Sequence, residues 1–309
     1  MSHLQAARIH SCLIAILAAG LLATIGCDGS KLGPPDGRLL VAVSIIPQAW
    51  LVRAVGGPRV EVVTLVTPGE SHHTYQPTDA QVSRVMASAV FFRIGSSFEN
   101  APWFHALEAA GKPRVVDLRD GVPLLDMAPH KDSDGDEGPP IATADRFAGK
   151  DPHVWLSPRR LKIQAATIAR TFAEQDPAHR AEYDRNLAVV QRQLDELDRT
   201  LAAKLAPLKG KAFFVFHPAW GYFADDYGLR QVSVEVEGKE PSDRELTQLQ
   251  QQARQSGVKV VFVQPQFGGR SARAVADAAG ARLEKADPLP ADLPAGLIQI
   301  ADALVASYQ

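Results

Sequence analysis

Short apolar runs alternate with amphipathic segments in both halves of the chain, and this alternation constrains the fold more than any other feature. The runs of the first half are 39–46, 60–66, 89–94 and 114–118. Segments with helical periodicity lie between them, at 48–55, 78–87 and 100–110. Such an alternation predicts βα units that share a mainly parallel sheet. We therefore expect an N-terminal α/β domain over residues 39–175.

The second half of the chain repeats this pattern. Its strand-like runs are 212–216, 231–236, 258–263 and 281–286. Ser242 and Glu245 form a capping box that predicts a helix ending near Ser256, and Gly257 is a suitable helix stop. We expect a C-terminal α/β domain over residues 207–309.

The longest helical pattern lies between the two halves. Asp176 and Pro177 supply an N-cap and a first-turn proline, and apolar residues then recur at spacings of three and four from Tyr183 to Leu205. The 30 residues from 177 to 206 would span about 45 Å as a helix. We interpret 176–206 as a stiff linking helix that runs along both domains. A long surface helix of one domain is the alternative.

The first 27 residues are typical of an export signal. Their apolar run, residues 13–25, is too short to span a membrane comfortably. Cys27 resembles the acylated cysteine of bacterial lipoproteins, although Thr24 stands where Leu is usual; ordinary signal cleavage and a retained anchor are the alternatives. We expect a flexible tether over 28–38 and a periplasmic or extracytoplasmic protein, held at the membrane only by a lipid on Cys27.

Composition narrows the class of protein. Cys12 lies in the signal, so Cys27 would be the one cysteine of the mature chain, whose core must be stable without a disulfide. The net charge of −2 gives no reason to expect a nucleic-acid partner. No later run is apolar enough to be transmembrane. Residues 127–150 are too polar and too rich in Gly and Pro to pack, and predict an acidic loop.

Three histidines stand where predicted strands give way to loops: His73, His153 and His217. They are separated by 80 and 64 residues (73 to 153, 153 to 217), so only a folded scaffold can bring them together. Ligands of parallel sheets bind at the carboxyl ends of strands. Asp287 follows after another 70 residues. Three imidazoles and one carboxylate would suit Zn²⁺ or a similar divalent cation.

Each histidine also has an ordinary structural interpretation. A pair such as His72 and His73 in a loop is more often solvated than metal-bound, and His153 is equally consistent with a buried ring bonded to a carbonyl. The acidic residues near His217 that could accept its ring N–H are Asp225, Asp226, Glu235 and Glu237. Each of these is also consistent with a plain surface charge.

Five motifs in a fixed order make the metal interpretation specific. They are Pro68-Gly69-x-Ser71-x-His73-Thr74-Tyr75-x-Pro77, Asp151-Pro152-His153-Val154-Trp155-Leu156, Phe216-His217-Pro218-Ala219-x-Gly221-Tyr222-Phe223, Glu237-Gly238-Lys239-Glu240-Pro241-Ser242 and Val263-x-Pro265-Gln266-Phe267. From Leu39 to its end, the chain resembles the metal-binding substrate-binding proteins of bacterial zinc and manganese ABC importers, the cluster A-I family.

The resemblance implies two Rossmann-like α/β domains joined by a long rigid helix, with the metal in the cleft between them. His73, His153 and His217 fall on the family's ligand positions, and Asp287 on one that often supplies a carboxylate. Manganese-importing relatives commonly have Glu at the third position, so His217 favours Zn²⁺ as cargo, with Mn²⁺ or Fe²⁺ as the alternative. The implied function is high-affinity capture of Zn²⁺ by a monomer that delivers it to a membrane permease with a cytoplasmic ATPase.

Three departures from the family pattern leave questions open. His72 replaces a residue that is typically proline, Gln264 stands where Glu is usual, and the loop before His153 holds His130 alone among acidic residues. The fourth ligand is Asp287, Glu70 or water. Because protons compete for imidazoles with a pKa of about 6.5, we expect weaker Zn²⁺ binding below about pH 6.

Two other functions would use the same residues. A zinc hydrolase needs an open coordination position and a general base, but the sequence has no His-Glu-x-x-His motif and offers Glu70 alone beside a proposed ligand in the first motif. A surface adhesin, or an extracytoplasmic metal chaperone that never meets an importer, is the second. We therefore expect a binding protein and not an enzyme.

Overall fold

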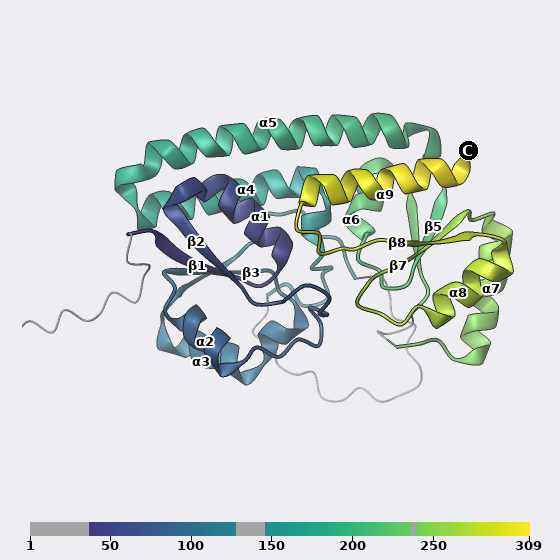
Figure 1. Cartoon of the computed structure of the whole chain (residues 1–309), viewed down its shortest axis with the longest axis horizontal. Helices are drawn as coiled ribbons and strands as arrows, with labels where there is room; N and C mark the ends of the chain where they lie inside the picture. Colours follow the sequence, from purple (N-terminus) through teal and green to yellow (C-terminus); the bar gives the residue numbers. More distant parts are fainter. Residues whose placement is uncertain (1–36, 128–145, 236–238) are drawn as a thin grey trace, which may run out of the picture. The chain divides into compact units, whose positions relative to one another are not determined.

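The computed structural model describes residues 37–127, 146–235 and 239–309 (Figure 1). The predicted signal peptide with Cys27, most of the tether, most of the acidic loop and Glu237 lie outside these ranges. Within them, no helix combines the length and the apolar character that crossing a membrane requires.

A four-stranded parallel sheet forms the first half, in the order β2-β1-β3-β4. Its strands are β1 (Leu39–Val43), β2 (Val60–Thr64), β3 (Val90–Arg93) and β4 (Arg114–Asp117). Its helices are α1 (Ile46–Gly56), α2 (Asp79–Met86), α3 (Pro102–Ala110) and α4 (Pro158–Gln175). Figure 1 shows α1 and α4 on one face of the sheet and α2 and α3 on the other. The central strands are buried on both faces, which explains why they consist of nearly continuous apolar runs.

The second half repeats this strand order as β6-β5-β7-β8, again all parallel. Its strands are β5 (Ala212–Val215), β6 (Arg230–Ser233), β7 (Val260–Val263) and β8 (Arg282–Lys285). Its helices are α6 (Gly221–Tyr227), α7 (Asp243–Ser256), α8 (Arg270–Ala279) and α9 (Leu293–Tyr308). The predicted capping box opens α7, because the Ser242 side chain accepts from the Glu245 N–H and the Glu245 carboxylate accepts from the Ser242 N–H. Gly257 ends the helix in the left-handed conformation with φ 60°.

One long helix, α5 (Arg180–Leu205), joins the two halves. Its 26 residues span about 39 Å. Its buried residues recur at helical spacing: Tyr183, Val190, Leu194, Leu197, Leu201 and Leu205. It packs against α1 and α4 of the first half and against α9 of the second (Figure 1). The predicted fold class, two α/β domains with a long joining helix, is therefore confirmed, while the exact domain boundaries remain predictions.

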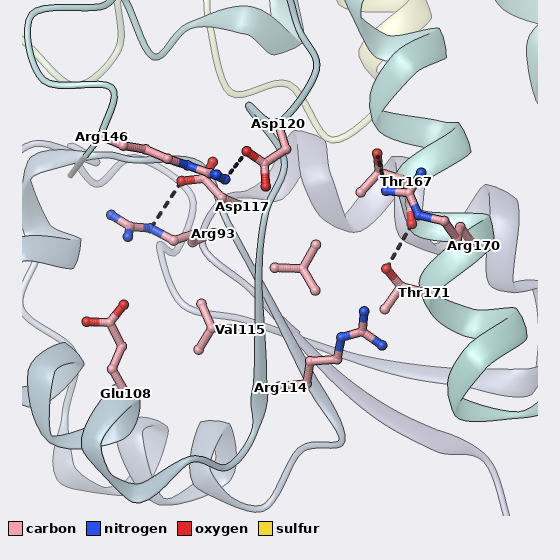
Figure 2. Close-up of a pocket in the computed structure, with 11 residues that line it drawn as sticks. Arg93, Glu108, Arg114, Val115, Asp117, Asp120, Arg146, Thr167, Arg170 and Thr171 are labelled. Atoms are coloured by element: carbon pink, nitrogen blue, oxygen red, sulfur yellow. Dashed lines mark hydrogen bonds and ion pairs between the residues drawn. The ribbon is translucent and has the colours of Figure 1, made fainter. Parts of the chain in front are cut away.

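The outer edge of β4 borders a polar cavity of about 410 Å³ (Figure 2). The ion pairs around it are Arg93 with Asp117, Arg114 with Glu174, and Arg146 with Asp120. These three cations have acidic partners, whereas Arg170, which also lines the cavity, donates to the Thr167 hydroxyl at 3.4 Å. A short edge strand flanked by charges is a common protection against unwanted strand pairing.

Candidate metal centre

The loop between β2 and α2 carries two histidines, His72 and His73. Its backbone is fastened to the turn after β3, because the Ser96 hydroxyl donates to the His72 carbonyl at 2.7 Å and the Ser97 hydroxyl donates to the His73 carbonyl at 3.0 Å. Residues 72–74 form a turn rather than an extended segment. The two neighbouring rings therefore lie together, with their centroids 4.1 Å apart.

His153 precedes the short 3₁₀ turn Val154–Leu156 that leads into α4. Its backbone N–H donates to the Asp151 carboxylate at 2.9 Å, and its ring Nδ1 lies 2.6 Å from the same Oδ1 atom. The hydroxyl of Tyr222, on α6 of the second half, donates to the Asp151 carbonyl at 2.6 Å. Asp151 therefore fixes the orientation of His153, and a contact from the other half of the molecule holds Asp151.

His217 follows β5 at the carboxyl end of the second sheet. The Gln264 side chain makes two hydrogen bonds to the His217 backbone. It accepts from the His217 N–H at 3.1 Å and donates to the His217 carbonyl at 2.5 Å. A glutamate at position 264 could not donate in this way when ionised. Ring Nδ1 of His217 lies 2.7 Å from Glu235 Oε1.

The Nε2 atoms of four histidines converge in one place. They are separated by 3.2 Å between His72 and His153, 2.9 Å between His73 and His217, and 3.2 Å between His153 and His217. The possible ligand atoms of all four lie within 4.8 Å of one another. Zn–N bonds of about 2.0–2.1 Å in a tetrahedron would place the nitrogens about 3.3 Å apart. These three separations are therefore close to those of a tetrahedral zinc shell.

Burial lowers the pKa of three of these imidazoles, those of His72, His73 and His217. It lowers the pKa of His73 to about 2, with further lowering by His217 and His153. It holds the pKa of His72 well below 6.5, and lowers that of His217 although the hydrogen bond to Glu235 opposes the shift. A metal binds the deprotonated form of its ligands. These three rings therefore offer lone pairs to a cation at neutral pH.

The structure brings together His73, His153 and His217, the three histidines selected from the sequence. It adds His72, which the sequence marked as a departure from the family pattern and whose role was left open. It does not add Asp287, whose exposed carboxylate accepts from the Leu289 N–H at 2.9 Å and from the Gln266 side-chain amide at 3.0 Å. Adjacency argued against His72 in the sequence, since neighbouring side chains usually point in different directions.

The acidic residues near His217 have separate roles. Glu235 is the acceptor for the His217 ring, and it is only 6% exposed. Asp225 and Asp226 instead pair with Arg160 on α4. Glu70, the other candidate ligand, is exposed and is not among the clustered histidines. Glu237 lies outside the described residues.

Proteins similar to this chain take up zinc. A family model described as the periplasmic zinc-uptake complex component A, ZnuA, matches residues 41–306. A high-affinity zinc uptake system protein ZnuA of Brucella abortus is 39% identical over 149 residues, which cover 47% of this chain and only 44% of that protein.

Solved structures extend the similarity over nearly the whole chain. A crystal structure of ZnuA is similar with a TM-score of 0.78 and 36% identity, over 88% of this chain and 100% of that one. A ZnuA deletion mutant with zinc bound gives a TM-score of 0.76 and 37% identity, over 87% of this chain and 98% of that one. These relatives are metal-binding proteins of uptake systems and not enzymes, which argues against the hydrolase alternative. From the match over residues 41–306, this chain belongs to the ZnuA family of periplasmic zinc-uptake binding proteins.

Proposed function

We propose that this protein captures Zn²⁺ outside the cytoplasmic membrane and delivers it to the permease of an ABC importer, which a cytoplasmic ATPase drives. Membership of a zinc-uptake family supports the cargo. The observation that carries the proposal is the convergence of imidazole Nε2 atoms at separations of 2.9–3.2 Å. The protein acts by coordination, and no bond of a substrate is broken.

We propose His73, His153 and His217 as zinc ligands and His72 as the fourth. Four nitrogen ligands suit Zn²⁺, whereas Mn²⁺ prefers oxygen ligands. Asp151 and Glu235 would each accept an Nδ1–H, which leaves the Nε2 lone pair of His153 and His217 directed at the metal. Asp287, the carboxylate expected from the resemblance, is in this proposal an outer residue.

The site is tested by metal analysis and titration of the purified mature protein. We expect one tightly bound zinc per wild-type chain and its loss in His217→Ala. His105→Ala is the matched control, because His105 lies on α3 with a side chain that is 59% exposed, and it should retain the metal. Equal zinc contents in wild type and His217→Ala would refute the proposed site.

Delivery needs a test in cells. A strain without this protein should grow slowly in zinc-depleted medium, and wild type should restore growth while His217→Ala should not. Normal growth of the deletion strain in the absence of a second zinc importer would contradict the import function. We also propose a lipid on Cys27. Wild type should incorporate a labelled fatty acid and Cys27→Ser should not, and equal labelling of the two proteins would contradict the proposal.

A further inference from the structure

We propose that the cavity beside the histidines binds zinc together with a small amine-bearing chelator of the amino-acid class. This inference rests on the proposed zinc function and concerns the form in which the metal arrives. Its basis is the size of the cavity, the chemistry of its walls and two buried acceptor atoms.

The cavity is much larger than a metal ion requires. It measures about 830 Å³, and His73, His153 and His217 form part of its lining. A water molecule occupies about 30 Å³, so an ion with six waters needs about 180 Å³. The cavity exceeds that more than fourfold, and its size falls among pockets of about 300–1,000 Å³ that hold small organic molecules.

The walls combine apolar side chains with amides, hydroxyls and the carboxylates of Asp126, Asp151 and Glu235. The apolar side chains are Leu125, Met127, Pro218 and Phe267, and the amides are Gln231 and Gln266. The Phe267 ring lies 5.4 Å from the His217 ring, with 26° between their planes, so an apolar surface continues directly from a proposed ligand. Apolar walls contribute little to holding a hydrated ion, but they favour the carbon skeleton of an organic ligand.

Two buried oxygens in this lining indicate the polarity of the ligand. Glu235 Oε2 and Gln266 Oε1 are both buried without a hydrogen-bond partner in the described part of the chain. A buried acceptor is costly unless a donor reaches it. Neither oxygen is accessible from the cavity as the two side chains stand, so a donor in the cavity would reach them after these side chains turn toward it. A ligand with N–H groups would then satisfy both acceptors, and the Glu235 carboxylate disfavours an anion that has none. An amino acid combines an amine with a metal-binding carboxylate.

The coordination shell has room for such a ligand. His72 is 3% exposed and packs edge-on against Trp155, so its ring approaches from the protein side and not from the cavity. Zinc accepts four ligands and can expand to five. The chelator would bind from the cavity side, either as a fifth ligand or in place of His72. A primary amine bound to zinc still carries two N–H bonds for the acceptors.

The test is calorimetric titration of L-histidine into zinc-loaded wild-type protein. We expect saturable 1:1 binding that leaves zinc on the protein, and none with the metal-free protein. Gln266→Ala should weaken L-histidine binding about tenfold, the loss of one hydrogen bond, with its zinc content unchanged. Asp287→Ala is the matched control, because it removes the Gln266–Asp287 hydrogen bond but keeps Oε1, and it should bind L-histidine normally.

Three results would overturn this inference. They are absence of L-histidine binding to the zinc-loaded protein, removal of the zinc by L-histidine, and acetate binding as tightly as L-histidine, which would mean that any carboxylate fills an open coordination position. A wild-type protein that binds no zinc would instead refute the proposed function. Zinc retention without L-histidine binding refutes the chelator inference alone.

Discussion

His153 and His217 are each oriented by a carboxylate on the ring nitrogen that faces away from the cluster. Asp151 lies 2.6 Å from Nδ1 of His153, and Glu235 lies 2.7 Å from Nδ1 of His217. His73 has a weaker neighbour, the Ser97 hydroxyl at 3.4 Å from its Nδ1. With the proton held on Nδ1, Nε2 keeps its lone pair. These neighbours orient the three rings for a cation before the cation binds.

The depressed pKa values change the pH dependence expected from the sequence. An ordinary imidazole loses about threefold in its neutral fraction from pH 7 to pH 6, so four would weaken zinc binding about 100-fold. Protons compete only below the pKa of the folded, metal-free protein, and burial lowers that pKa for His72, His73 and His217. We therefore expect less than about tenfold weakening over this interval, and the larger loss at more acidic pH.

Competition titrations with a zinc chelator at pH 7, 6 and 5 check this expectation. The dissociation constant should rise steeply only in the lower interval. A 100-fold rise between pH 7 and pH 6 would show that the rings titrate as exposed histidines do.

Substitutions of His72 and Asp287 distinguish the two candidates for the fourth ligand. His72→Ala should weaken zinc binding by about 100-fold or more, beyond the 10–100-fold typical of residues that support a ligand. Asp287→Asn should leave it unchanged within about twofold, because that carboxylate is engaged by Leu289 and Gln266. Chelator-competition titrations measure both constants. A larger loss in Asp287→Asn than in His72→Ala would restore the carboxylate as the ligand.

At the scale of elements, the sequence predicts all eight strands of the described structure. The central strands are short apolar runs, whereas the edge strands β6 (Arg230–Ser233) and β8 (Arg282–Lys285) each contain one apolar residue and are indicated by the apolar residues around them. The sequence does not predict α8 or α9. The buried face of α8 consists of small residues, Ser271, Ala272, Val275 and Ala276, which give a weak apolar signal. In α9 apolar residues occur around most of the helix, so the contrast between its faces is small.

At the site, the sequence did not show that His72 joins the cluster or that Asp287 lies outside it. The conformation of residues 72–74 depends on Ser96 and Ser97, more than twenty positions away, so the local sequence does not show that both histidines face the cluster. Asp287 is drawn into its own turn by the Leu289 N–H. Such contacts follow from tertiary packing and not from residue spacing.

A substitution at Gly221, the first residue of α6, tests the role of Asp151 in metal binding. A Cβ atom on Gly221 would lie 2.9 Å from Asp151 Oδ2. Because Asp151 orients His153, Gly221→Ala should weaken zinc binding about tenfold, the lower end of the effect of supporting residues. Gly268→Ala is the control, since its Cβ would meet nothing within 4 Å. Equal zinc affinity in the two variants would separate Asp151 from metal binding.

At the scale of the whole described structure, the two sheets are joined by packing and by hydrogen bonds. One hydrophobic cluster continues from the first sheet through α5 to β5, β7 and α9, while a smaller cluster lies under α7 and α8. The Tyr222 hydroxyl accepts from the Leu125 N–H at 3.1 Å and donates to the Asp151 carbonyl. These two hydrogen bonds join α6 of the second half to the segments before and after the acidic loop, the second of which carries His153.

The ion pair between Arg160 on α4 and Asp226 on α6 is the most buried charge contact of this junction. It measures 2.7 Å, with the two side chains 10% and 3% exposed. Removing one partner leaves a buried charge, which typically costs about 3–5 kcal/mol. We therefore expect Arg160→Leu to lower the free energy of unfolding in urea by about that amount. Arg199→Ala, which breaks an exposed pair with Glu196, should leave the free energy of unfolding essentially unchanged.

A double variant tests the cause of that loss. If the buried Asp226 carboxylate, left with Arg159 at 3.8 Å and the Ser157 hydroxyl, is responsible, Arg160→Leu combined with Asp226→Leu should recover most of the stability, because a buried ion pair replaced by apolar residues is often neutral. Arg160 also donates to Asp225 at 2.9 Å and to the Pro123 carbonyl at 3.2 Å. If the double variant is as unstable as Arg160→Leu alone, the loss of these two hydrogen bonds, and not the buried charge, accounts for the lost stability.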